Sequence, residues 1–191
     1  MLVLLAGLIL FLGIHAISIF APAARDRWAA AMGPNLWRGL FSILSLIGFV
    51  MLVRGYAAAR LDPVVLYAPP VWTRHLVMLL TLPVFVMLFA AYLPGRIKTS
   101  LKHPMLAAVK LWALAHLLAN GMLADVMLFG GFLAWAVLDR ISLKRRVQRP
   151  IAAAPASRWN DLAAVVLGLA AYAAFVLWLH RQLIGVPVLP V

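Results

Sequence analysis

The chain has 191 residues, of which 66% are hydrophobic and only 12% are charged. Ordinary soluble domains contain about 45–50% apolar residues, so this composition excludes that class and indicates a polytopic helical membrane protein. Cysteine is absent, which excludes disulfides, iron–sulfur clusters and thiolate ligands. The formal net charge of +12 is explained by basic loops that face the cytoplasm and anionic lipid. We therefore expect membrane lipid as a partner and no nucleic acid.

Six apolar stretches are predicted to cross a bilayer core of about 30 Å. They cover residues 2–20, 39–58, 75–93, 104–118, 122–138 and 159–179. We expect the first to be a retained helix, because it lacks the basic start of a secretory signal and is too long for one. Pro83 should kink or locally unwind the third. Asn120 and Gly121 form a tight-turn dipeptide, which predicts that the short fourth and fifth spans are an antiparallel hairpin. The predicted fold is an all-α bundle of about six transmembrane helices, a single domain over residues 1–191.

The distribution of basic residues between the loops predicts the orientation. If the N-terminus lies outside the cytoplasm, the inner loops contain most of the lysine and arginine residues. The outer loops then contain only Arg54, Arg60, Arg74 and Arg181. Because positive charge is retained on the cytoplasmic side, we expect both termini outside.

Two histidines lie within the apolar spans. Pro104 suits the first position of a helix, so His116 should lie roughly 18 Å from that end at about 1.5 Å per residue. An ionisable side chain at that depth costs about 3 kcal/mol unless it is satisfied, which makes it a functional candidate. His15 lies roughly 9 Å from the same side of the membrane. With no thiolate or acidic cluster, this pair suits a bis-imidazole haem better than a hard-cation or zinc site. The alternative for each histidine is a hydrogen bond to a neighbouring helix.

Other side chains are candidates for a second site or for cofactor contacts. His75 and His180 lie near the outer ends of their spans, either as interfacial side chains or as ligands of a second site. Haem propionates would need charge-assisted partners. The nearest cations on the cytoplasmic side are Arg25, Arg38, Arg96, Lys98 and Arg140. Asp139 and Arg140 should form a local ion pair where the fifth span ends. No catalytic residue is assigned, because no nucleophile has a base beside it.

Four segments resemble the NnrU family of integral membrane proteins. They read GIHAISIFAP at 13–22, PPVWTRH at 69–75, RIKTSLKHPMLAAVKLWALAHLLANG at 96–121 and LAWAVLDRISLKRR at 133–146. The resemblance covers nearly the whole chain and implies a connection with denitrification, since NnrU proteins accompany nitrite and nitric oxide reduction. The expected location is the inner (plasma) membrane of a bacterium.

The chain is also similar to plant 15-cis-zeta-carotene isomerase, a haem b membrane enzyme with two axial histidines. His15 matches its first-helix His-Ser-Gly motif, and ALAH at 113–116 matches its Cys-Leu-Ala-His motif. The resemblance implies haem b with His15 and His116 as iron ligands. If the chain is an enzyme, it implies a haem-dependent isomerase acting on a carotenoid or another lipid-soluble substrate. Ala113 replaces the cysteine, so the isomerase's redox-dependent ligand change does not transfer.

A more distant likeness is to membrane isoprenylcysteine and phospholipid methyltransferases. Their Arg-His-Pro motif is similar to Lys102, His103 and Pro104, but they bind S-adenosylmethionine with downstream acidic residues as well, and this chain contains no glutamate. Three hypotheses follow. The leading one is a haem b protein acting as a redox or gas-linked accessory to denitrification. The others are a lipid-modifying isomerase or methyltransferase, and a structural or assembly partner without a cofactor.

Overall fold

The computed structural model describes residues 1–149 and 152–189, and these residues form helices joined by short connections. The helices are α1 (Leu2–Phe20), α2 (Pro22–Met32), α3 (Pro34–Ala59), α4 (Thr73–Tyr92), α5 (Arg96–Leu101), α6 (Pro104–Ala119), α7 (Leu123–Ser142), α8 (Asn160–Ala174), the π-helical turn η1 (Phe175–Leu179) and α9 (His180–Ile184). Within the described ranges there is no strand, only an isolated bridge between Val65 and Met122. The predicted all-α class is confirmed.

Four helical segments are long and apolar enough to cross a membrane: α1, α3, α4 and the continuous segment from Asn160 to Ile184. α6 is apolar but shorter. The structure therefore supports a multi-pass membrane protein. The stretch between the first two predicted spans, residues 21–38, is largely helical and contains α2 and the start of α3. α3 begins at Pro34, several residues before the predicted start, because Gly33 takes a φ of 78° and proline is favoured at a first helical position.

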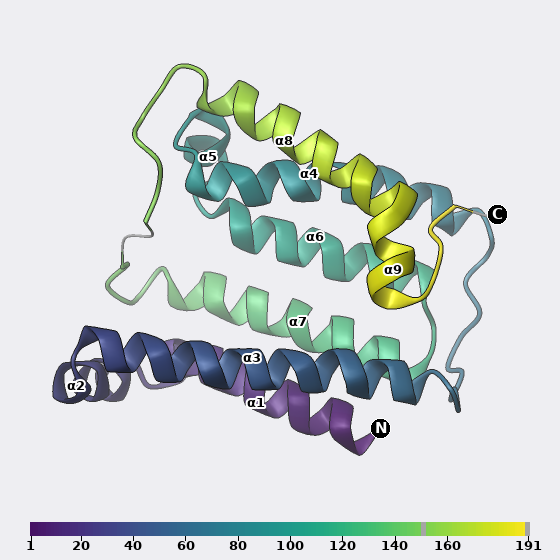
Figure 1. Ribbon diagram of the computed structural model, residues 1–191, viewed down its shortest axis with the longest axis horizontal. Helices are drawn as coiled ribbons and strands as arrows, with labels where there is room; N and C mark the ends of the chain where they lie inside the picture. Colours follow the sequence, from purple (N-terminus) through teal and green to yellow (C-terminus); the bar gives the residue numbers. More distant parts are fainter. Residues whose placement is uncertain (150–151, 190–191) are drawn as a thin grey trace. The chain divides into compact units, whose positions relative to one another are not determined.

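The chain divides into two compact units, and each is described by itself. Unit 1 contains residues 1–68 and 120–147, and unit 2 contains residues 69–119 and 148–191. Figure 1 shows the helices of each unit: α1, α3 and α7 pack together in unit 1, and α4 packs with α6 and α8 in unit 2. α6 and α7 belong to different units, so the predicted hairpin of these two helices stays a prediction.

Glycines allow α1 and α3 to pack closely in unit 1. A Cβ atom at Gly55 would lie 2.3 Å from the backbone nitrogen of Leu4, and one at Gly7 would lie 2.7 Å from that of Leu52. Leu4 and Leu52 are themselves buried in the core between these helices. Small residues at such crossings let backbones approach within van der Waals contact, which is how helices associate when lipid surrounds them.

α4 is the central helix of unit 2. At Pro83 a kink or a local unwinding was predicted; the helix continues through Pro83, so the unwinding is wrong, and the kink stays a prediction. On one side it meets α8, where a Cβ atom at Gly168 would lie 2.5 Å from the Cα of Val86. Asp161, in the first turn of α8, accepts hydrogen bonds from the backbone N–H groups of Arg96 (2.8 Å) and Ile97 (3.1 Å). These contacts hold α5 against the start of α8.

Candidate functional site

His15 lies partly buried on α1, within a group of aromatic rings. Its ring centroid is 4.4 Å from that of Phe11, 5.0 Å from that of Phe41 on α3 and 6.0 Å from that of Trp135 on α7. Its Nδ1 lies 2.6 Å from the carbonyl oxygen of Phe11. A carbonyl only accepts, so Nδ1–H donates and the neutral ring has its lone pair on Nε2. This hydrogen bond stays within α1, unlike the predicted alternative of a bond to a neighbouring helix.

His116 shows the same local arrangement on α6, in unit 2. Its Nδ1 lies 2.8 Å from the carbonyl oxygen of Trp112, and the two ring centroids are 5.2 Å apart. In both histidines the backbone carbonyl four residues earlier therefore selects the Nδ1–H tautomer. Histidines that bind metals through Nε2 commonly donate their other ring N–H to a backbone carbonyl in this way. The local geometry of each ring is compatible with metal binding through Nε2.

Two buried donors near His15 have no acceptor in the part of the chain that the structure describes. They are Nε1 of Trp135, whose ring is perpendicular to that of His15, and Nη1 of Arg146. The other terminal nitrogen of Arg146 donates to Asp139 at 2.6 Å. Trp135 and Asp139 are four residues apart on α7, so they share one helix face. An unpaired buried N–H is rare and costs about 1–3 kcal/mol, which suggests that an acceptor is supplied by a bound group or water.

Neither donor was among the sequence-based candidates. The four-residue spacing of Trp135 and Asp139 could have indicated that they share one face of a helix. Nothing in the local sequence indicates that Arg146 would fold back onto Asp139. The predicted ion pair between Asp139 and Arg140 is wrong, since Asp139 pairs with Arg146. Adjacent residues on a helix point in different directions, whereas the turn after Ser142 returns Arg146 to the Asp139 side.

The five predicted propionate partners are divided between the units. Arg25, Arg38 and Arg140 belong to unit 1 with His15, and Arg96 and Lys98 belong to unit 2 with His116. Two already have partners: Arg25 forms an ion pair with Asp26 at 3.0 Å, and Lys98 Nζ donates to the carbonyl of Ala91 at 2.8 Å. Within the described residues we find no side-chain partner for Arg38, Arg96 or Arg140.

The second-site candidates both belong to unit 2. His75 is exposed in the first turn of α4, and His180 Nδ1 lies 2.7 Å from the carbonyl oxygen of Val186. In residues 1–149 and 152–189 no group of three or more His, Cys, Asp or Glu side chains could hold a metal ion. A second site with these histidines stays a prediction.

Unit 1 contains a buried carboxyl group that sequence reasoning missed. Asp125, at the start of α7, is fully buried. It accepts hydrogen bonds from the Tyr56 hydroxyl (2.5 Å) and from the Met122 backbone N–H (2.9 Å). The carboxyl group thus caps α7 and links it to the end of α3. Both hydrogen-bond donors belong to the protein itself, so the Asp125 carboxyl group has a structural role.

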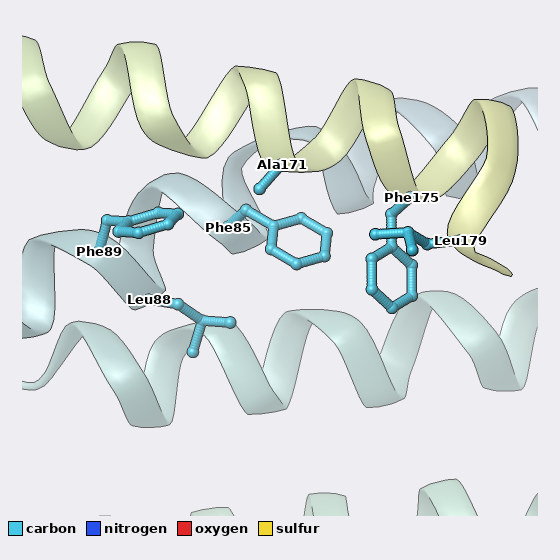
Figure 2. A pocket seen from close by; sticks show the side chains of 6 residues that line it. All are labelled: Phe85, Leu88, Phe89, Ala171, Phe175 and Leu179. Atoms are coloured by element: carbon cyan, nitrogen blue, oxygen red, sulfur yellow. The ribbon is translucent and has the colours of Figure 1, made fainter. Parts of the chain in front are cut away.

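Unit 2 contains an apolar cavity of about 300 Å³. Figure 2 shows its walls: Phe85, Leu88 and Phe89 from α4, Ala171 from α8, and Phe175 and Leu179 from η1. π-helical turns are rare and are frequently found at functional sites. Because every lining side chain is a hydrocarbon, the cavity suits part of a lipid-soluble molecule but offers no group for acid–base or nucleophilic chemistry.

Comparison with known proteins identifies the family. A family model described as NnrU protein matches residues 3–188. Searches of curated proteins and of solved structures find no match. The matched region includes both candidate iron ligands and the described helices, apart from the first residue of α1. The resemblance inferred from the four sequence segments is confirmed: this multi-pass helical membrane protein belongs to the NnrU family.

Proposed function

We propose that the protein binds haem b through His15 and His116 and acts as a redox or gas-linked accessory to nitrogen-oxide metabolism. Membership of the NnrU family fits a role associated with denitrification. We also propose that it resides in the inner (plasma) membrane of a bacterium with both termini outside the cytoplasm, as the distribution of basic residues favours.

The observation that carries the haem proposal is the environment of His15. The carbonyl of Phe11 holds the Nδ1 proton, which leaves the Nε2 lone pair for iron. The rings of Phe11, Phe41 and Trp135 provide an apolar aromatic surface of the kind on which a porphyrin packs. In unit 2 the carbonyl of Trp112 selects the same tautomer of His116, with the lone pair on Nε2. Two neutral imidazoles are an established ligand set for low-spin haem iron.

The propionates would be held by cationic or N–H donors. The sequence-based candidates are Arg25, Arg38, Arg96, Lys98 and Arg140, of which we expect one or two to take part. To these the unpaired donors Trp135 Nε1 and Arg146 Nη1 are added, because both are buried and lack an acceptor in the described structure, and the Trp135 ring lies against that of His15. A propionate oxygen at this position would remove the cost of leaving them unpaired.

Haem at this site would supply one-electron transfer or the binding of a diatomic gas. His15 and His116 are the residues that would hold the iron, and a gas could bind there only if one of these imidazoles were released. Ala113, at the position of the isomerase cysteine, could not supply a replacement ligand.

The absorbance spectrum of the detergent-purified protein, expressed with haem supply, tests the proposal. We expect a Soret band of a low-spin haem with one haem per chain by pyridine haemochrome. His15→Ala and His116→Ala should each lose haem or convert it to a high-spin form, while the matched control His75→Ala should not. Unchanged haem content and spectrum in both variants would refute the ligand assignment. If no Soret band appears after reconstitution, a function without haem is favoured.

The apolar cavity of unit 2 favours a second candidate, haem-dependent isomerisation of a lipid-soluble polyene. Its three phenylalanine rings suit the flat chain of conjugated double bonds. Incubating the haem-loaded, reduced protein with a cis-carotenoid and separating the isomers by chromatography tests this reaction. Turnover lost in both His116→Ala and Phe85→Ala would support haem-dependent isomerisation with the substrate in this cavity, and unchanged turnover in Phe85→Ala would exclude the cavity as its site.

A further inference from the structure

A second cavity, of about 530 Å³, lies in unit 1 where the end of α1, α2 and the start of α3 meet. Its walls combine three chemical types: hydrocarbon, hydroxyl and guanidinium. The principal side chains are Ile14, Phe41, Ser18, Ser42, Arg25 and Arg38. No acidic side chain lines it. The cavity is therefore amphipathic, with both cationic and apolar side chains in its lining.

The two arginines differ in how much of their charge is compensated. Arg25 is held in place by the carboxylate of Asp26 at 3.0 Å and by the ring of Trp37, 5.2 Å from its guanidinium carbon. Arg38 is exposed and has no acidic partner within the described residues. The cavity consequently has an excess of positive charge. Because the charge of Arg38 is not compensated, Arg38 is the side chain that can bind an anion.

The cavity lies where two apolar helices leave the membrane core. α1, a candidate span, ends at Phe20, and α3, another candidate span, begins at Pro34. The intervening α2 buries no residue and exposes Trp28, as expected for a helix at the lipid–water interface. At this depth, phospholipid phosphates meet the first methylene groups of the acyl chains. A lining that contains both guanidinium and hydrocarbon groups matches that boundary.

His15 does not line this cavity, although Ile14 and Ser18 on the same helix do. Ile14 lies about 100° and Ser18 about 60° around α1 from His15, and Phe41 both lines the cavity and packs against the His15 ring. The His15 ring itself is not part of the lining, so the guanidinium and hydroxyl groups of the cavity can bind a ligand other than haem iron.

We propose that this cavity binds the headgroup of an acidic glycerophospholipid. Arg38 and Arg25 bind the phosphate, the hydroxyls of Ser18 and Ser42 bind headgroup oxygens, and Ile14 and Phe41 contact the start of an acyl chain. An arginine guanidinium can donate two parallel hydrogen bonds to a phosphate, which makes it specific for this group. Arg25 and Arg38 are also candidate propionate partners of the proposed haem, so a lipid bound here would leave the propionates to the remaining candidates.

Lipid titration of the full-length protein in neutral detergent tests the proposal. We would measure bound lipid by native mass spectrometry, comparing phosphatidylglycerol with phosphatidylcholine in the wild type, Arg38→Gln and Arg54→Gln. Arg54 is an exposed arginine on the same helix, α3, but outside the cavity, so it is the matched control. We expect the wild type to prefer phosphatidylglycerol and Arg38→Gln to bind it about tenfold more weakly. Arg54→Gln should bind it like the wild type.

Three results would overturn the proposal. Equal binding of the two lipids would exclude headgroup selection, and equal losses in Arg38→Gln and Arg54→Gln would indicate general surface charge. If inorganic phosphate competes as well as the lipid, the site is one for a free anion. His15→Ala should keep normal lipid binding, so failure of the haem proposal and failure of this one are distinguishable. Circular dichroism of each variant checks that it is folded.

Discussion

The buried pair of Tyr56 and Asp125 allows a quantitative prediction. Asp125 is fully buried and accepts from two donors, the Tyr56 hydroxyl and the Met122 N–H. Asp125→Asn keeps the shape but replaces one acceptor oxygen with an NH2 group, so the side chain can no longer accept from both donors and one donor hydrogen loses its acceptor. Leaving a buried donor unpaired costs about 1–3 kcal/mol. Tyr56→Phe removes a hydrogen bond to this carboxyl group and should cost about 1.5–3 kcal/mol.

The double variant separates this interaction from simple loss of packing. Because either single change already breaks the same hydrogen bond, the double variant should be less destabilised than the sum, with a coupling of about 0.5–3 kcal/mol. The free energy of unfolding would be measured in mixed micelles by titration with denaturing detergent. Tyr92→Phe, a change at a partly exposed tyrosine, is the control and should have little effect. Additive single effects, or single variants as stable as the wild type, would refute the assignment of Asp125 as a structural cap.

Three further predictions concern the helices and the candidate ligands. Gly55→Ala should destabilise unit 1 by about 1–3 kcal/mol, because the new Cβ would lie 2.3 Å from a backbone nitrogen of α1. The control is Gly39→Ala, which has no atom within 4 Å of its Cβ and should be neutral or stabilising. Thermal unfolding of both variants measures the difference. Asp161→Ala should lower the free energy of unfolding by about 0.5–2 kcal/mol, because the Asp161 carboxylate accepts from the first two backbone amides of α5. Hydrogen exchange at these two amides should become faster, and unchanged exchange would contradict the capping role. In the haem-loaded ferrous protein, His15→Ala should bind carbon monoxide faster than the wild type, because His15 is the ligand expected to leave. If only His116→Ala binds carbon monoxide faster, His116 is the ligand that leaves.

Much of the candidate site could be predicted from local sequence, and part of it could not. The position of His116 within an apolar helix followed from Pro104, and α6 does begin at Pro104. The tautomer of each histidine is also local, because it depends on a carbonyl one turn earlier. The unpaired donors Trp135 and Arg146 were missed, since being unpaired depends on every group that packs around them.

The sequence by itself determined the class of the protein and the course of its helices. Its hydrophobic content indicated membrane spans, and lipid offers no hydrogen bonds to backbone groups, so apolar spans must satisfy them internally as helices. The bounds of α1 match the prediction because they depend on a continuous apolar run. The family assignment likewise came from short segments that are contiguous in the chain.

Only the tertiary structure decided which polar groups meet. The Tyr56 hydroxyl reaches Asp125 across 69 positions of sequence, and Asp139 pairs with Arg146 rather than with its neighbour Arg140. Tertiary structure also placed Arg25 and Arg38 around one cavity that excludes His15. Hydropathy and helix propensity act within a few turns of one helix, whereas these contacts depend on how the faces of different helices pack.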